Sequence, residues 1–240
     1  MNKLKKKASD VIEKYPRVQT FITSLHDIAS KTINPNRPVP VYEEAGAVYF
    51  LIPKAASRSI NYVFLEMTEG KKPEQIGQQK QRYEKPFREA MQSDLFKFSF
   101  VRNPFSRIVP CYKDKVHRRS SVTKKYFGSL RDVSFETFLR RINKIPTRYM
   151  ERHFKPKHAW LSYRGELQPD YIGKIEHLKE DFQRVKDQCG VDFPPQLNKT
   201  EKKKDWKDYY DEKLPASLNP FTRKIARNGT RMPTSISSNI

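Results

Sequence analysis

The sequence predicts a single α/β domain with a central parallel sheet that is flanked by helices. Three apolar runs, Val48–Ile52, Phe96–Val101 and Tyr171–Ile175, have the composition of buried strands, and a helical pattern follows each of them. Strands that alternate with helices are typical of a parallel sheet with right-handed crossovers. The length of 240 residues fits one domain that is large enough to bury a core.

Segments at both ends of the chain differ from this body. We expect residues 1–40 to form an N-terminal helical extension, 41–214 to form the domain, and 215–240 to be a poorly ordered tail. Apolar residues recur at helical spacing between Val11 and Leu25, and the Pro/Asn-rich segment 34–40 separates that helix from the body.

Within the body, helices are predicted where apolar residues recur at helical spacing between the strands. Pro104 suits a first helical turn and marks the start of the helix after the second strand. Ser134 and Asp205 can cap two later helices, and Gly190 can end a third. The polar segment 69–82 is expected to be a loop or a loose helix. The predicted helices span 59–67, 86–95, 104–116, 135–142, 178–189 and 205–214.

The composition makes the protein a strong cation. There are 48 Lys and Arg against 27 Asp and Glu, a net charge of +21, which attracts nucleic acid, anionic membranes, acidic polysaccharides or nucleotides. Cys111 and Cys189 are too few for a disulfide framework or a metal cluster, so we expect reduced thiols and no metal. No run approaches the roughly 18 apolar residues that span a bilayer, and we expect no transmembrane segment.

Two strand–turn–helix units carry the residues with chemical potential. The first strand runs into Pro-Lys-Ala-Ala-Ser-Arg-Ser at 53–59, and the second into Arg-Asn-Pro-Phe-Ser-Arg at 102–107. A strand that delivers Lys or Arg to a helix N-terminus can hold a phosphate, because free backbone N–H groups and the helix dipole point at the anion. Two such units in one small domain indicate a ligand with phosphate groups at both ends.

These units resemble the two nucleotide-binding motifs of the sulfotransferases. Within that family they are most similar to the carbohydrate branch, sulfotransferase family 2, which includes the HNK-1, chondroitin and heparan 2-O enzymes. The resemblance covers roughly residues 47–214 and implies a P-loop-like fold. Further segments that support it are 152–156, 171–178, 181–182, 197–200 and 209–210.

The resemblance implies an enzyme that moves the sulfuryl group of 3′-phosphoadenosine 5′-phosphosulfate (PAPS) to a hydroxyl of a carbohydrate by in-line displacement. Lys54 would neutralise charge on the bridging oxygen of the leaving group, and the planar fork of Arg102 would bind the 3′-phosphate. His153 is the candidate general base, with a structural role as the alternative. The residues expected to bind the cofactor are Pro53, Lys54, Ala55, Ala56, Ser57, Arg58, Ser59, Arg102 and Arg107.

Two departures from the family pattern favour an alternative. Arg58 stands where most members have Thr, and Pro110 stands where the family has a Ser that shares the 3′-phosphate with Arg102. The alternative is a catalytically impaired member that binds PAP (the product adenosine 3′,5′-bisphosphate) or acidic glycan. A basic nucleic-acid-binding protein fits the charge but not the motifs. A P-loop kinase is disfavoured, because no glycine lies between Pro53 and Ser59.

The acceptor and the compartment are predicted less closely. We expect PAPS and a hydroxyl acceptor, a glycan, as partners and no specific nucleic acid. The cation-rich segment 113–131 either lines a groove for an acidic glycan or forms a solvated basic face. Golgi relatives carry an anchor that is missing here, so we expect a cytoplasmic protein. A peripheral membrane protein, or a Golgi protein whose anchor the chain lacks, is the alternative.

Overall fold

The computed structural model describes residues 37–117, 130, 132–147, 150, 152–163, 165–197 and 205–210. Most of the expected N-terminal extension and the whole of the expected tail lie outside these residues. The same holds for most of the cation-rich segment after His117. Among the described residues, no helix is both long enough and apolar enough to cross a membrane.

The sheet at the centre of the domain has five strands. They are β1 (Pro38–Tyr42), β2 (Ala47–Tyr49), β3 (Glu84–Pro86), β4 (Phe96–Val101) and β7 (Tyr171–Lys174), in the order β3-β1-β2-β4-β7. β2 pairs in parallel with β4, and β4 with β7, whereas β1 is antiparallel to both of its neighbours. Four strands therefore run in one direction. The predicted α/β class with a largely parallel sheet is confirmed, and the reversed strand β1 is an addition to it.

β1 was not predicted from the sequence, because Pro38 and Pro40 interrupt its run of apolar residues. The segment 34–40 was expected to be a linker, yet its last three residues begin this strand. Proline has no N–H to donate to a neighbouring strand, but the way in which β1 pairs with its two neighbours accommodates both prolines. Pro38 and Pro40 align only with β3, while Val41 and Tyr42 are the residues that align with β2. The boundary expected at residue 40 thus falls within the sheet.

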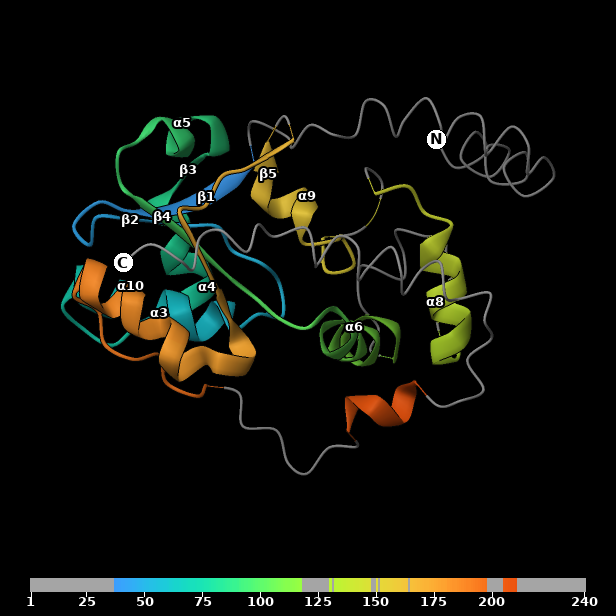
Figure 1. Ribbon diagram of the computed structural model, residues 1–240. Helices are drawn as coiled ribbons and strands as arrows, with labels where there is room; N and C mark the ends of the chain where they lie inside the picture. The colour runs from blue at the N-terminus through green and yellow to red at the C-terminus, as the bar shows by residue number, and fades with distance from the viewer. Residues whose placement is uncertain are drawn as a thin grey trace.

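Helices cover both faces of the sheet (Figure 1). α3 (Ser57–Glu69) and α10 (Leu178–Cys189) pack on one face, and α5 (Phe87–Gln92) and α9 (His158–Leu161) on the other. Aromatic rings fill much of the first interface: Phe98 stacks on Tyr49 and Phe64, and Phe100 packs on Phe182. Because each aromatic ring buries a large area, this core forms although only 36% of the residues are hydrophobic.

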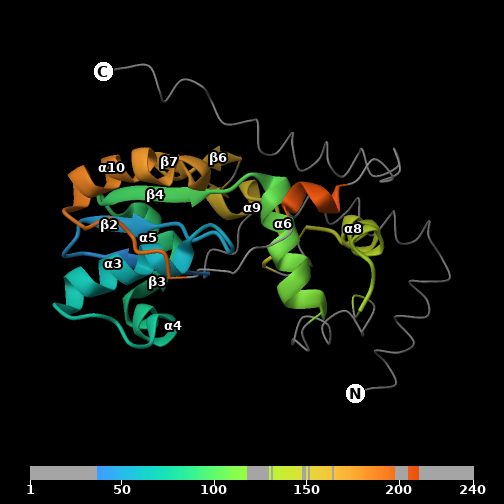
Figure 2. The same ribbon diagram turned by 90° about the horizontal axis from the view of Figure 1, so that it is seen from below.

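A second group of helices lies beyond the end of β4 (Figure 2). It contains α6 (Pro104–Tyr112), α8 (Phe135–Asn143) and the short 3₁₀ helix η4 (Trp206–Tyr209), and β4 leads directly into α6. Tyr112 joins the three elements, because its ring packs on Phe135, Phe138 and Tyr209. The group has a hydrophobic cluster of its own beside the sheet.

Local end signals were good guides to the helices. Ser134 accepts a hydrogen bond from Thr137 N and caps α8, and Gly190 ends α10 with a positive φ of 69°, both as predicted. Asp205 also acts as a cap, but the described helix after it is only η4. The polar segment 69–82 holds two short helices. The remaining elements are α4 (Ile76–Gln79), η1 (Lys80–Tyr83), η3 (Ile175–His177) and the hairpin β5 (Ser162–Tyr163) and β6 (Glu166–Leu167).

The helix predicted from Pro104 toward Val116 is present but changes its winding. After Tyr112 it continues as a π-helical turn, η2 (Lys113–His117). Pro110 lies inside α6 and has no N–H, so the hydrogen-bond ladder loses one member immediately before the wider turn. Single π turns of this kind are frequent at functional sites.

We expect Gly173→Ala to lower the free energy of unfolding by about 1–3 kcal/mol through overpacking. Gly173 is aligned with Phe100 across the β4–β7 pair, and an added Cβ would lie 2.8 Å from Phe100 Cζ and 2.9 Å from Cδ1. The ring cannot easily move, because it is fully buried. Urea unfolding measures the change. Gly77→Ala is the control, since nothing lies within 4 Å of a Cβ there; an equal loss in both variants would refute this explanation.

Candidate functional site

The parallel pairing of β2 and β4 brings the two predicted motifs to one edge of the sheet. Tyr49 is aligned with Phe98, so the chain leaves both strands in the same direction. Two hydrogen bonds extend the contact into the first loop: Phe50 N donates to Phe98 O at 2.8 Å, and the buried Ser99 Oγ donates to Phe50 O at 2.7 Å. The carboxyl ends of parallel strands are where α/β proteins bind ligands.

The loop between β2 and α3 has an unusual backbone for a segment without glycine. Lys54 has a φ of 66° and Ala56 a φ of 52°, in the left-handed region. A residue with a Cβ pays about 1–2 kcal/mol there, and such strain collects at functional sites. The loop reverses the chain so that α3 begins immediately after Ala56, with its first turn facing the sheet edge.

The amino end of α3 has no cap. Ala56 occupies the capping position and offers no side-chain acceptor, and the first amide of the helix with a carbonyl partner in the described chain is Ile60, which donates to Ala56 O. The amides of Ser57, Arg58 and Ser59 therefore remain available to an anion, as the sequence analysis expected for this motif.

The side chains of this loop divide between packing and exposure. Pro53, Ala55 and Ser59 are buried, and Ala55 belongs to the core beneath the sheet. Ser57 is half-buried, and Arg58 is exposed at the first turn of α3.

Lys54 is held by a carboxylate that sequence reasoning missed. Its Nζ lies 2.8 Å from Asp114 Oδ2, and Lys115 Nζ lies 3.4 Å from the same oxygen. Asp114 is on the π turn η2, 60 residues away in the chain. Partial burial raises the pKa of Asp114, but hydrogen bonds and charge from Lys54 and Lys115 outweigh it and leave that pKa below its usual value. In the sequence, the only feature that sets Asp114 apart is its position between Lys113 and Lys115.

The second motif differs from the first, and here the expectation of free helix amides was wrong. Asn103 caps α6, because its side chain accepts from Phe105 N and Ser106 N, and Pro104 has no N–H. Arg102 is half-buried beside this cap. Its Nε donates to Ser106 Oγ at 3.1 Å, and its two terminal nitrogens find no partner among the described residues. An anion at this motif would therefore meet side chains, not free amides of the helix end.

The side chain of Arg107 contacts His153 through the backbone carbonyl of His153. Arg107 is 4% exposed, and its terminal nitrogens donate to His153 O at 2.9 Å and to Lys155 O at 2.7 Å. Burial lowers the pKa of Arg107. Its guanidinium thus holds the 152–155 turn against α6, and His153, which is half-buried, takes its position from this contact.

Lys157 and Glu176 complete the surroundings of Arg102. Lys157 is 8% exposed, and its Nζ donates to Arg102 O at 3.0 Å. Burial, assisted by the charge of Arg107, lowers the pKa of Lys157 to about 8, against an opposing effect of Glu176. Glu176 Oε1 accepts from Asn103 N at 2.6 Å and so holds the β4–α6 turn. Nothing in the sequence marks Lys157 as a site residue, because its burial depends on the tertiary fold.

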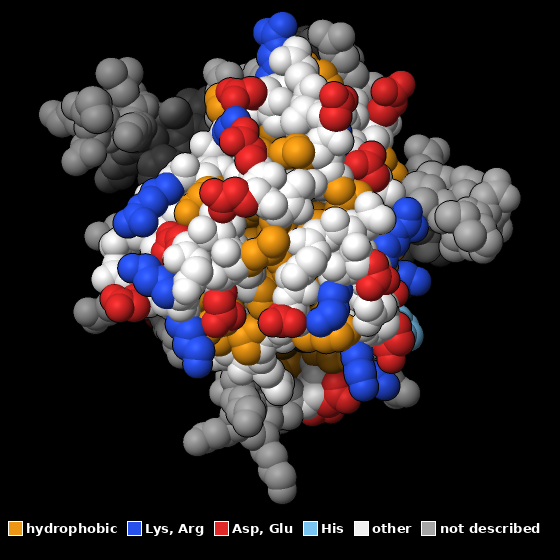
Figure 3. All heavy atoms as spheres, turned by 90° about the vertical axis from the view of Figure 1, so that its left-hand side faces the viewer, with side chains coloured by type: hydrophobic (Ala, Val, Ile, Leu, Met, Phe, Trp, Pro, Cys, Tyr) orange, Lys and Arg blue, Asp and Glu red, His pale blue; other side chains and the backbone are white. Residues whose placement is uncertain are grey.

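Charge is distributed unevenly between the two ends of the sheet. The amino-end face mixes acidic and basic side chains around apolar patches (Figure 3). At the carboxyl-end edge, the cations outnumber the carboxylates among the residues that the structure describes. The cations include Lys54, Lys115, Arg102, Arg107 and Lys157, and the carboxylates are Asp114 and Glu176.

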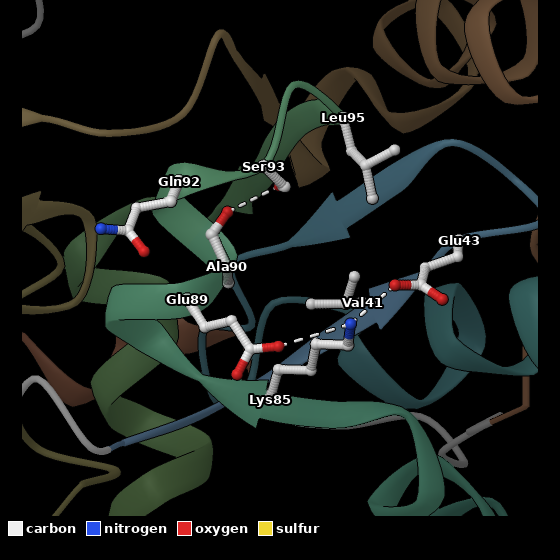
Figure 4. Close-up of a pocket in the computed structure, with 8 residues that line it drawn as sticks. All are labelled: Val41, Glu43, Lys85, Glu89, Ala90, Gln92, Ser93 and Leu95. Atoms are coloured by element: carbon white, nitrogen blue, oxygen red, sulfur yellow. Dashed lines mark hydrogen bonds and ion pairs between the residues drawn. The ribbon is translucent and has the colours of Figure 1, made fainter.

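A hollow elsewhere on the molecule has different chemistry. It lies between β1, β3 and α5, and its lining contains none of the predicted site residues (Figure 4). Its one cation is already paired: Lys85 Nζ lies 2.6 Å from Glu43 Oε1 and 3.5 Å from Glu89 Oε1. No three His, Cys, Asp or Glu side chains of the described ranges gather as metal ligands would. The sheet edge at Lys54 and Arg102 is therefore the candidate site.

We expect Ala56→Gly to raise the free energy of unfolding by about 0.5–1 kcal/mol. Glycine relieves the left-handed strain of about 1–2 kcal/mol, and part of that gain is lost to its greater freedom in the unfolded chain. Ala55→Gly is the control, because Ala55 is fully buried and has no positive φ, so it should lose stability. Thermal and urea unfolding of both variants measure the changes; a destabilised Ala56→Gly protein would argue against strain at this position.

Comparison with known proteins agrees with this geometry. A protein-family model described as the sulfotransferase family matches residues 39–228, which include both strand–turn–helix units and Lys157. No curated protein and no solved structure matches the chain. Since the match extends over more than half of the sequence, the chain belongs to the sulfotransferase family.

Proposed function

We propose that this protein transfers the sulfuryl group of PAPS to a hydroxyl of a carbohydrate. Family membership supports sulfuryl transfer in general. The observation that carries the finer proposal is the uncapped amino end of α3, with Lys54 beside it and Arg102 on the adjacent strand end. PAPS is a nucleotide with a phosphosulfate at its 5′ end and a phosphate at its 3′ end.

The residues at the sheet edge fit such a donor. The free amides of Ser57, Arg58 and Ser59 suit the 5′-phosphosulfate, because they converge at a helix end with no competing cap. The terminal nitrogens of Arg102 have no partner among the described residues and suit the 3′-phosphate, which a guanidinium can bind in bidentate fashion.

Each of these side chains would have a distinct task. The donor supplies an activated sulfuryl group, whose transfer leaves negative charge on the oxygen that bridged it to phosphorus. The Lys54 ammonium would stabilise that charge, which requires it to turn from Asp114 toward the donor. His153 would accept the proton of the attacking hydroxyl. Arg107 contributes by holding the turn that carries His153.

The carbohydrate acceptor rests on two supports. The motifs are most similar to those of the carbohydrate branch, and the net charge of +21 favours an acceptor that carries negative charge. The catalytically impaired alternative shares the donor site and differs only in transfer, so the two are separated by the experiments below.

Wild-type protein should bind PAP in a calorimeter, and Lys54→Ala and Arg102→Ala should each weaken binding by about ten- to a hundredfold, since each removes a charged hydrogen bond to phosphate. Lys72→Ala is the matched control, because Lys72 is an exposed lysine just after the far end of α3. Failure of the wild type to bind PAP would overturn the proposal. Binding without transfer of label from [³⁵S]PAPS to a panel of glycans and small alcohols would establish the impaired alternative.

Asp114→Asn should tighten PAP binding by about two- to fivefold. The change removes a negative charge beside the anion and frees Lys54 from a partly exposed ion pair, an interaction that is worth about 0.2–1 kcal/mol. The same substitution in a Lys54→Ala background should give a smaller gain, since there is then no lysine to release. Weaker binding by Asp114→Asn would mean that the carboxylate positions Lys54 for the donor.

A further inference from the structure

Lys157 is a buried cation whose surroundings do not account for its charge. Its ammonium carries three hydrogens, and its one hydrogen bond to the described residues is to a neutral carbonyl, Arg102 O. The charged groups that act on it are Arg107, which opposes its charge, and Glu176, which favours it. Isolated buried charges are costly unless they are paired.

Neither of those two groups pairs with it. Glu176 is exposed and forms no hydrogen bond or ion pair with Lys157; its Oε1 instead accepts from Asn103 N at 2.6 Å. Arg107 is itself a cation, and its terminal nitrogens bind backbone carbonyls. Next to Lys157, Arg102 has terminal nitrogens that bind no residue in the described part of the chain. The cluster of Arg102, Arg107 and Lys157 against Glu176 therefore has two positive charges in excess. Each of its three cations has a hydrogen-bond donor without a partner among the described residues, including the buried Nε of Arg107.

We infer that Lys157 binds the 3′-phosphate of the nucleotide together with Arg102. A phosphate monoester carries close to two negative charges at neutral pH and accepts several hydrogen bonds, which matches the excess charge and the spare donors of the cluster. The inference rests on the proposed function, since it takes PAPS as the donor. It adds a residue that the motifs at 53–59 and 102–107 do not contain.

The position of Lys157 suits this task. Its Nζ contacts the backbone of the residue that carries the guanidinium, so the two cations share one anchor at the end of β4. Arg107 binds the carbonyl of Lys155 two residues earlier and fixes the turn from which Lys157 extends. Burial and the charge of Arg107 lower the pKa of Lys157 to about 8, and a bound dianion would raise it again.

The test compares two nucleotides that differ only in the 3′-phosphate. Calorimetry with PAP and with adenosine 5′-phosphate is done on the wild type, on Lys157→Met and on Lys157→Gln, which retains a hydrogen-bond donor for Arg102 O. Both variants should lose about ten- to a hundredfold in affinity for PAP and less than twofold for adenosine 5′-phosphate. Lys174→Met is the control for net charge, since Lys174 is an exposed lysine at the end of β7.

Each result decides the matter. If the wild type prefers PAP but the folded Lys157 variants keep that preference, the inference is wrong and the proposed donor site stands. Equal losses for both nucleotides would also overturn it, because they indicate a general structural defect. If the wild type shows no preference for PAP over adenosine 5′-phosphate, both the inference and the proposed donor fail. Should Lys157→Met not fold, Lys157→Gln alone gives the comparison.

Discussion

The site depends on the parallel contact between β2 and β4. The strand register aligns Tyr49, the last residue of β2, with Phe98. The hydrogen bond from Ser99 Oγ to Phe50 O extends the contact one residue beyond the end of β2. Ser99 is completely buried, so this bond competes with no water. It fixes where the loop to α3 begins, and hence the position of Lys54 relative to Arg102. The stacked rings of Tyr49 and Phe98 stabilise the same register from the adjacent core.

The features that could be predicted from the sequence are those that depend on residues close together in the chain. The limits of β4 and α10, the cap at Ser134 and the stop at Gly190 depend on residues within a few positions of each other. β1 was missed because Pro38 and Pro40 imitate a linker, and only its pairing with β3 resolves the conflict. The Asn103–Pro104 cap could have been predicted, since Asn before Pro is a common way to begin a helix.

Most residues of the candidate site were named from the sequence, but the contacts between them were not. Lys155 and Lys157 are indistinguishable in the sequence, yet the fold leaves one half-buried and the other 8% exposed. Likewise, the sequence named Lys54 but not Asp114, because the π turn that presents the carboxylate follows from winding beyond Pro110. Pairings across 60 residues or more are set by the tertiary fold, and no local pattern encodes them.

The two helix ends at the sheet edge have opposite designs, and the difference has an energetic consequence. α3 keeps its amides free through strained residues at Lys54 and Ala56, whereas α6 satisfies its own amides through Asn103. Around α6, buried Arg107 and Lys157 are held by carbonyl dipoles, which weaken their mutual repulsion less than a counter-ion would. An anion at this edge would satisfy the free amides of α3 and offset the repulsion between the cations around α6. A ligand that does both would stabilise the folded protein by an amount that grows with the logarithm of its concentration relative to its Kd, so the features that make this edge costly to fold are the ones that would favour the phosphate-bearing donor proposed above.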